Sequence, residues 1–163
     1  MPDCLSHLLI AYVSSRSLLR SASMPLFLVG SLLPDVLLRG GRLFFCQNLR
    51  RDFLELYLAP LHTPFVIAFV CLAIAQLFHR EIRKRSFVLL YSGCLNHFIL
   101  DLFQRSINGL GFTREPVEGY RWLYPFSWFD FQIGLFWAED ASYSLLVLLP
   151  LGIWFWLVPR ERD

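Results

Sequence analysis

The chain has 163 residues, of which 56% are hydrophobic and 17% are charged, and its formal net charge at pH 7 is +2. Soluble globular proteins carry about 25% charged residues, and disordered chains combine low hydrophobicity with high net charge. The four scattered cysteines are too few for a disulfide-rich mini-domain, and the small net charge argues against nucleic acid as a partner. We therefore predict an integral membrane protein with a single domain over residues 1–163.

Two weakly apolar segments open the chain. Residues 4–19 are interrupted by serines and an arginine, and residues 22–38 contain Gly30, Pro34 and Asp35. Because proline lacks an amide hydrogen and its ring clashes with the preceding turn, we predict that the second helix is kinked or ends at Pro34. Each segment is a marginal span, a half-helix or a re-entrant piece.

The next two segments differ in polarity. Residues 39–56 alternate basic and bulky apolar side chains, which is typical of an amphipathic helix or loop lying in the membrane interface. Residues 57–78 form a stretch of 22 residues without Lys, Arg, Asp or Glu, close to the ~20 needed to cross a bilayer. Pro64 suits the first turn of a helix, which places His62 just before the regular helix.

A short basic loop separates this span from the following one. Residues 79–85 read HREIRKR, and residues 86–103 are apolar except for Asn96, His97 and Asp101. Short loops rich in Lys and Arg stay in the cytoplasm. The loop therefore predicts that the second strong span runs outward from the cytoplasm.

The chain continues with an aromatic-rich loop and a third strong span. Residues 104–141 are rich in Trp, Tyr, Phe, Gly and Pro, as expected at a membrane interface, and residues 142–159 carry no charge. Glu139 and Asp140 precede this span. They suit the N-terminal end of a helix, and the alternative is that they complete a second metal site.

Together these segments predict an all-α, polytopic membrane helical bundle with three clear spans and two short or marginal N-terminal helices. Arg160 and Arg162 place the C-terminus on the same side as the basic loop 79–85. The expected location is the bacterial cytoplasmic (inner) membrane, with the C-terminus in the cytoplasm.

Five ionisable residues within the apolar segments converge on one depth in this topology, at the extracytoplasmic ends of four segments. Ionisable groups inside spans are costly and indicate functional sites. Cys71 and Cys94, in contrast, are interpreted as packing residues. The converging residues are His7, Asp35, His62, His97 and Asp101.

His97 and Asp101 form the most specific pair among them. Their i, i+4 spacing places both on one helix face, which suits metal ligation. Imidazole and carboxylate ligands suit Zn²⁺, with Mn²⁺ or Fe as further candidates. The alternative is that the two side chains simply hydrogen-bond each other across a turn.

Four short motifs carry a resemblance to a known family: SH at residues 6–7, GSLLPD at 30–35, HT at 62–63 and NHFILD at 96–101. In this order they resemble the bacterial inner-membrane family of predicted membrane-bound, metal-dependent hydrolases, associated in some members with LexA regulation. The ligand order is also similar to that of the zinc-dependent phospholipase C and nuclease group. The resemblance covers residues 1 to about 130.

The resemblance implies which residues hold the metal. A His-Arg pair that family members typically carry before a Thr-His-Ser motif is missing from residues 56–63, so we expect one or two metal ions rather than three. The implied ligands are Asp35, His62, His97 and Asp101 on one ion, with His7 on a neighbouring ion that Asp101 bridges.

The expected function is hydrolysis of a phosphoester in a lipid or lipid-linked substrate, an activity that is inherited from the resemblance. A bound divalent metal lowers the pKa of water from ~15.7 towards ~7 and so supplies hydroxide at neutral pH. The expected catalytic residues are Asp35, His97 and Asp101, and the expected partner is membrane lipid. The alternative is a non-enzymatic membrane protein whose His/Asp cluster binds or relays an ion or proton, or only stabilises helix packing.

Overall fold

The computed structural model describes residues 4–18, 23–45, 59–105, 122–127, 136–137, 149–154 and 156–157. Within them the helical elements are α1 (Cys4–Leu18), α2 (Met24–Phe45), the 3₁₀-helix η2 (Ala59–His62), α4 (Pro64–Ala75) and α5 (Arg80–Phe103). Residues 149–154 and 156–157, from the third strong span, are also helical. The prediction of a helical protein is therefore confirmed for the part of the chain that the structure describes.

Beside the helices, the described part of the chain contains one short strand pair. Two-residue strands β1 (Gln104–Arg105) and β2 (Phe136–Trp137) pair in parallel, with Gln104 opposite Phe136. Both fall in the segment 104–141 that was predicted as a loop. The pairing provides hydrogen-bond partners for backbone groups directly after α5. It also brings Phe136 and Trp137 next to the C-terminal end of α5.

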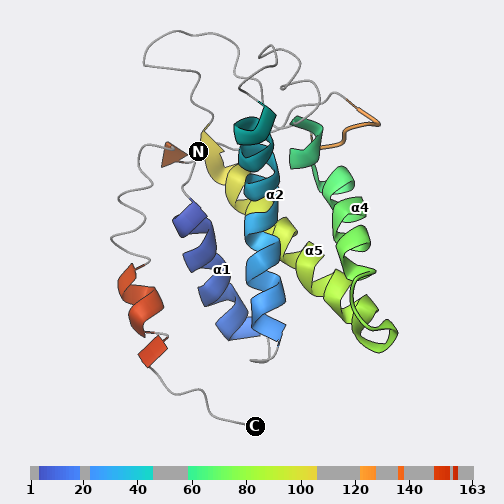
Figure 1. The fold of residues 1–163 in the computed structure, drawn as a ribbon. Coiled ribbons are helices and arrows are strands. Elements are labelled where there is room, and N and C mark those ends of the chain that lie inside the picture. Colours follow the sequence, from blue (N-terminus) through green and yellow to red (C-terminus); the bar gives the residue numbers. More distant parts are fainter. Residues whose placement is uncertain are drawn as a thin grey trace, which may run out of the picture.

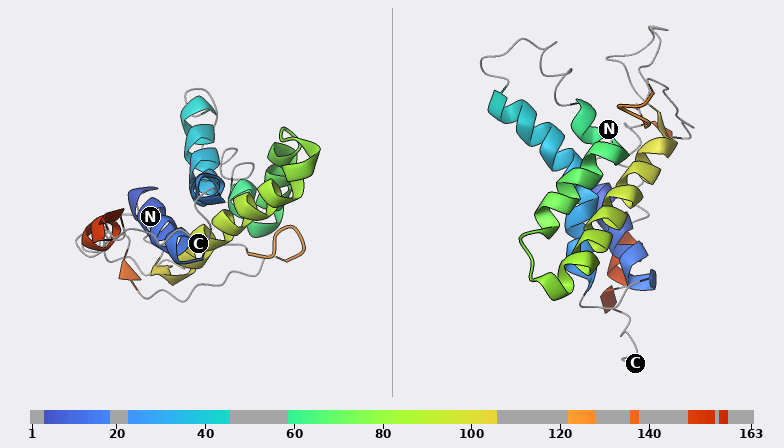
Figure 2. Two further views of the ribbon diagram at one scale, coloured as in Figure 1. Left: turned by 90° about the horizontal axis from the view of Figure 1, so that it is seen from below. Right: turned by 90° about the vertical axis from the view of Figure 1, so that its right-hand side faces the viewer.

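The helices pack around α2 and α5. Helix α2 contacts both α1 and α5, and α4 packs against α5 on the far side from α1 (Figure 1). The turn between α4 and α5 lies at the opposite end of the bundle from η2 (Figure 2). A buried apolar cluster joins these helices, with Ile67, Cys71, Leu90, Cys94 and Phe98 at its centre.

Helix α5 is the one described helix that is long and apolar enough to cross a membrane. It begins at Arg80, so most of the basic segment 79–85 is helical rather than a loop. The predicted span 57–78 is shorter than expected, because α4 covers only Pro64–Ala75. Its 12 residues rise about 18 Å, less than the hydrocarbon thickness of about 30 Å.

The start of α4 follows the prediction. Thr63 has an extended backbone, with φ −127° and ψ 145°, and Pro64 occupies the first helical turn. Proline is favoured there because the first amide hydrogens of a helix have no intrahelical acceptor. His62 therefore ends η2 immediately before α4 begins.

Helix α2 does not end at Pro34 but continues to Phe45, so the prediction of a helix end at Pro34 is wrong. The helix also enters the segment 39–56 that was predicted to lie in the interface. Helix α5 compensates for the hydrogen bond that is lost at Pro34. The Gly30 carbonyl, which has no amide donor at residue 34, accepts a hydrogen bond from the Cys94 thiol of α5 instead.

Glycines bring α2 and α5 into backbone contact. A Cβ atom at Gly30 would overlap the Leu90 carbonyl, and one at Gly93 would overlap the Phe27 carbonyl. Small residues at such crossings are typical of helix packing in membranes. The close crossing fixes which residues of the two helices face each other.

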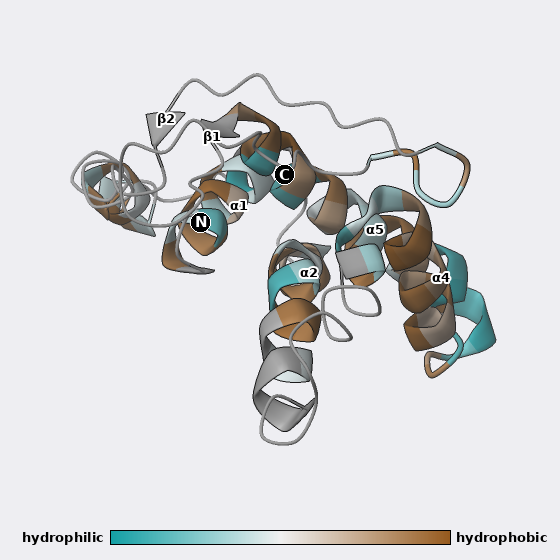
Figure 3. Cartoon of the chain, turned by 90° about the horizontal axis from the view of Figure 1, so that it is seen from above, coloured by the Kyte–Doolittle hydropathy of each residue, from teal (hydrophilic) through white to brown (hydrophobic). Residues whose placement is uncertain are grey.

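Large apolar side chains are also exposed on the outer faces of the bundle. Figure 3 shows hydrophobic residues over much of α4 and α5, with hydrophilic residues near the turn between them. Phe69 and Leu72 of α4 and Val88 and Ile99 of α5 are more than a third exposed. Exposed apolar side chains of this size are compatible with helices surrounded by lipid.

Candidate metal centre

All five ionisable residues that the sequence placed at one depth meet in the structure. His7 comes from α1, Asp35 from α2, His62 from the end of η2, and His97 and Asp101 from α5. Each is at most 6% exposed. The structure therefore brings together the complete predicted set, and the roles of its members as ligands and catalytic groups stay predictions.

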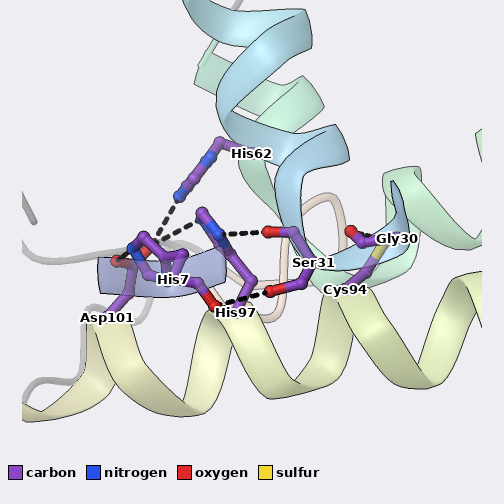
Figure 4. A network of polar contacts seen from close by, with 7 residues as sticks. All are labelled: His7, Gly30, Ser31, His62, Cys94, His97 and Asp101. Atoms are coloured by element: carbon purple, nitrogen blue, oxygen red, sulfur yellow. Dashed lines mark hydrogen bonds and ion pairs between the residues drawn. The ribbon is translucent and has the colours of Figure 1, made fainter. Parts of the chain in front are cut away.

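The Asp101 carboxylate lies among three imidazole rings (Figure 4). His62 Nε2 is 2.8 Å from Oδ2, His97 Nε2 is 3.2 Å from the same oxygen, and His7 Nε2 is 3.4 Å from Oδ1. The Nε2 atoms of all three histidines therefore point at one carboxylate.

The orientation of His97 is set by the backbone of α2. Its Nδ1 atom lies 2.8 Å from the Ser31 carbonyl oxygen. A carbonyl oxygen only accepts, so Nδ1 carries the hydrogen and Nε2 of the neutral ring carries a lone pair. Nε2 has no hydrogen-bond partner among the described residues. A lone pair and a carboxylate oxygen thus face each other in a buried site, and either a proton between them or a bound cation makes this contact favourable.

His7 also has buried ring nitrogens without a hydrogen-bond partner among the described residues, which is a second indication of a bound ion. Its ring stacks on the His97 ring, with the two ring centroids 3.9 Å apart, and its side chain is 1% exposed. Neither ring nitrogen has a hydrogen-bond partner within the described parts of the chain. Buried polar atoms of this kind call for an explanation, and an ion is one of the standard ones.

The ligand atoms form two overlapping groups of three, each with all atoms within 4.8 Å of one another. One group is His7, His97 and Asp101, and the other is Asp35, His62 and His97. His97 belongs to both. Neither group contains cysteine, and nitrogen and oxygen donors of this composition fit Zn²⁺, with Mn²⁺ or Fe as alternatives.

Comparison with known proteins agrees with the resemblance inferred from the motifs. The model of the family described as "YdjM inner membrane protein" matches residues 4–162. The chain belongs to this YdjM family. No curated protein and no solved structure matches the chain.

In this YdjM family member, the His97–Asp101 pair is not a simple hydrogen bond between neutral His97 and an ionised Asp101. The hydrogen of neutral His97 goes to Ser31, and Nε2 then faces Asp101 at 3.2 Å as an acceptor. Asp101 instead lies at hydrogen-bond distance from His62. The i, i+4 spacing thus places two acceptors side by side rather than a donor and an acceptor.

Sequence reasoning missed the groups that surround the predicted ligands. Phe98 places its ring edge-to-face against both His62 and His97, with ring centroids 5.3 and 5.7 Å away. Trp122 covers Phe98 in turn, with its centroid at 5.9 Å. Aromatic composition alone did not distinguish these two rings from interface residues. They give the histidines a water-excluding, apolar wall.

Glu139 and Asp140, the other candidates for a second metal, lie outside the described residues. The same is true of Arg160 and Arg162, which entered the topology argument.

Proposed function

We propose that this YdjM family member is a metal-dependent hydrolase of the bacterial cytoplasmic membrane that cleaves a phosphoester in a lipid or lipid-linked substrate. The observation that carries the proposal is the buried Nε2 lone pair of His97 facing the Asp101 carboxylate. Such an arrangement is unfavourable on its own and becomes favourable when both groups bind one cation.

The two ligand groups support a role for each residue. His7, His97 and Asp101 would hold one ion, and Asp35 and His62 would extend the site for a second ion. A bound divalent ion lowers the pKa of water and attracts the phosphoryl oxygens. The carboxylates of Asp35 and Asp101 are the groups that accept the proton of the attacking water, and Phe98 keeps bulk water away from the rings.

A lipid substrate is supported by the surface beside the site. Phe65 lies two residues after Thr63, in the first turn of α4. Its ring centroid is 5.1 Å from that of Phe69 and 4.8 Å from that of Phe126. Phe126 is 76% exposed and Phe69 is 58% exposed. Exposed aromatic rings gather at the level of lipid headgroups, which is where the phosphoester of a membrane lipid lies.

The charges at the opposite end of α5 support an assignment of the site to one side of the membrane. Arg80, Lys84 and Arg85 are exposed in its first two turns, and His97 lies about 25 Å further along the helix axis. Because basic helix ends face the cytoplasm, the proposed site faces the extracytoplasmic side.

The experiment that tests the proposal measures metal and activity on the same preparation. We expect the protein purified in detergent at neutral pH to carry one or two zinc ions per chain and to hydrolyse phospholipid in mixed micelles. Chelation abolishes hydrolysis, and zinc restores it. Asp101→Asn, which removes the central charge, binds little metal and is inactive.

Folded wild-type protein without metal would overturn the proposal. It would favour the non-enzymatic alternative, in which the His62–Asp101 hydrogen bond of 2.8 Å serves helix packing or proton relay.

A further inference from the structure

Pro34 leaves one carbonyl of α2 without its helical donor. In a regular helix the amide of residue 34 bonds the carbonyl of residue 30, and proline has no amide hydrogen to give. In the structure the Gly30 carbonyl accepts a hydrogen bond from Cys94 Sγ of α5 at 3.1 Å. A neighbouring helix therefore supplies the donor that Pro34 lacks.

The single thiol hydrogen of Cys94 is used in this bond to Gly30. Cys71 Sγ of α4 lies 3.6 Å from Cys94 Sγ, and both side chains are 0% exposed. Since Cys94 donates to Gly30, Cys71 is the donor in the contact between the two sulfur atoms. The thiols form a directed chain from α4 through α5 to α2.

A second bond between α5 and α2 lies directly beside the first. Ser31 follows Gly30, and its carbonyl accepts the Nδ1 hydrogen of His97 at 2.8 Å. His97 is three residues after Cys94, so both donors lie on the same face of α5 (Figure 4). Two consecutive carbonyls of α2 thus accept hydrogen bonds from two side chains that lie one turn apart on α5.

We propose that Pro34 and Cys94 are a matched pair of positioning residues for the metal centre. The proline leaves the Gly30 carbonyl open, the thiol occupies it, and this bond fixes the neighbouring Ser31 carbonyl where it orients His97 towards Asp101. The proposal rests on the proposed metal site, and it adds a role for two residues that are not ligands.

The test is a double-mutant cycle of Cys94→Ala and Pro34→Ala, read as the zinc dissociation constant in competition with a chelator. Changes in the groups that orient a ligand typically cost about 10–100-fold in metal affinity. We expect Cys94→Ala to raise the dissociation constant about 10-fold when residue 34 is proline. When residue 34 is alanine its amide bonds Gly30, so we expect Cys94→Ala to have an effect below about twofold.

Two further variants separate hydrogen bonding from packing. Cys94→Ser retains a donor and is expected to bind zinc within about threefold of wild type, whereas Cys94→Val retains volume without a donor and behaves like Cys94→Ala. Cys71→Ala is the matched control, because it removes a buried thiol of the same size but leaves the Cys94–Gly30 bond in place. We expect it to bind zinc like wild type.

A readout without metal keeps the test independent of the proposed function. In the metal-free protein the ¹⁵N shifts of the His97 ring report which nitrogen carries the hydrogen, and we expect Nδ1–H in wild type and a mixture of tautomers in Cys94→Ala. If wild type binds no zinc but the tautomer changes in this way, the hydrolase proposal fails and the positioning role stands. Equal effects of Cys94→Ala in both residue-34 backgrounds, or none in either, would overturn the positioning role.

Discussion

His97 donates its Nδ1 hydrogen to the backbone carbonyl of Ser31 at 2.8 Å, and this bond decides what the other side of the ring can do. In the neutral ring with its hydrogen on Nδ1, Nε2 is an acceptor 3.2 Å from the Asp101 carboxylate. Metal-binding histidines commonly donate their second ring nitrogen to a carbonyl or carboxylate in this way. The α2 backbone therefore orients His97 in the way that is common among metal-binding histidines.

The crossing of α2 and α5 makes this bond geometrically accessible, which leads to a first prediction. A Cβ at Gly93 would overlap the Phe27 carbonyl and lie 2.8 Å from Ser31 N. Gly93→Ala therefore forces the helices apart, and we expect it to lower the free energy of unfolding in detergent by about 1–3 kcal/mol. We also expect weaker zinc binding, because the Ser31 carbonyl moves with the α2 backbone.

Gly40→Ala is the matched control for Gly93→Ala. Gly40 is also helical in α2, and a Cβ there meets nothing within 4 Å. Alanine at an open helical position stabilises by about 0.5–1 kcal/mol relative to glycine. If the two variants unfold alike, the close crossing does not hold the helices in register.

The convergence of the five ionisable residues was predictable because it needs only approximate helix positions. The basic segment 79–85 set the direction of the spans, and the i, i+4 spacing of His97 and Asp101 set a common face. Errors of a few residues in helix ends, such as the early start of α5 at Arg80, do not move these residues to the other end of the bundle.

The course of α2 beyond Pro34 was not predictable from the segment itself. The donor that compensates for the proline is Cys94, 64 residues further along the chain. The local sequence shows that a hydrogen bond is lost at Pro34, but it does not show which distant residue replaces the donor. The same holds for Phe98 and Trp122, whose place against the histidines depends on tertiary packing.

A second prediction concerns the exposed aromatic rings beside the site. If Phe126 contacts the acyl region of a lipid substrate, Phe126→Ser lowers kcat/KM for a long-chain phospholipid, by about 10-fold for the loss of one buried aromatic contact. Hydrolysis of a short-chain, water-soluble phosphoester by the same variant stays near the wild-type rate. The ratio of the two values, measured in the same detergent, is the readout.

Leu77→Ser is the control for this comparison. Leu77 is 85% exposed and lies after α4, at the end of the bundle away from η2. We expect this variant to leave both substrates unaffected. A parallel loss of activity on both substrates in Phe126→Ser would mean that the ring supports the site rather than the lipid.

The last prediction uses the two overlapping ligand groups. His7→Ala removes a member of one group, and His62→Ala removes a member of the other, so each variant retains three potential ligands in the group left intact. His97 belongs to both groups. We therefore expect His7→Ala and His62→Ala to retain part of the wild-type zinc content after dialysis, and His97→Ala to retain none, because neither group then has three ligands.

His79→Ala is the control for the histidine series, since His79 is exposed in the turn before α5. Zinc per chain by elemental analysis is the measurement, and thermal unfolding of each metal-free variant confirms that it is folded. If His7→Ala loses zinc as completely as His97→Ala, the two groups form a single site rather than two. In that case Asp101 is the centre of the site, because its carboxylate lies within 3.4 Å of the Nε2 atoms of three histidines. His97 is then one of several equivalent ligands around it.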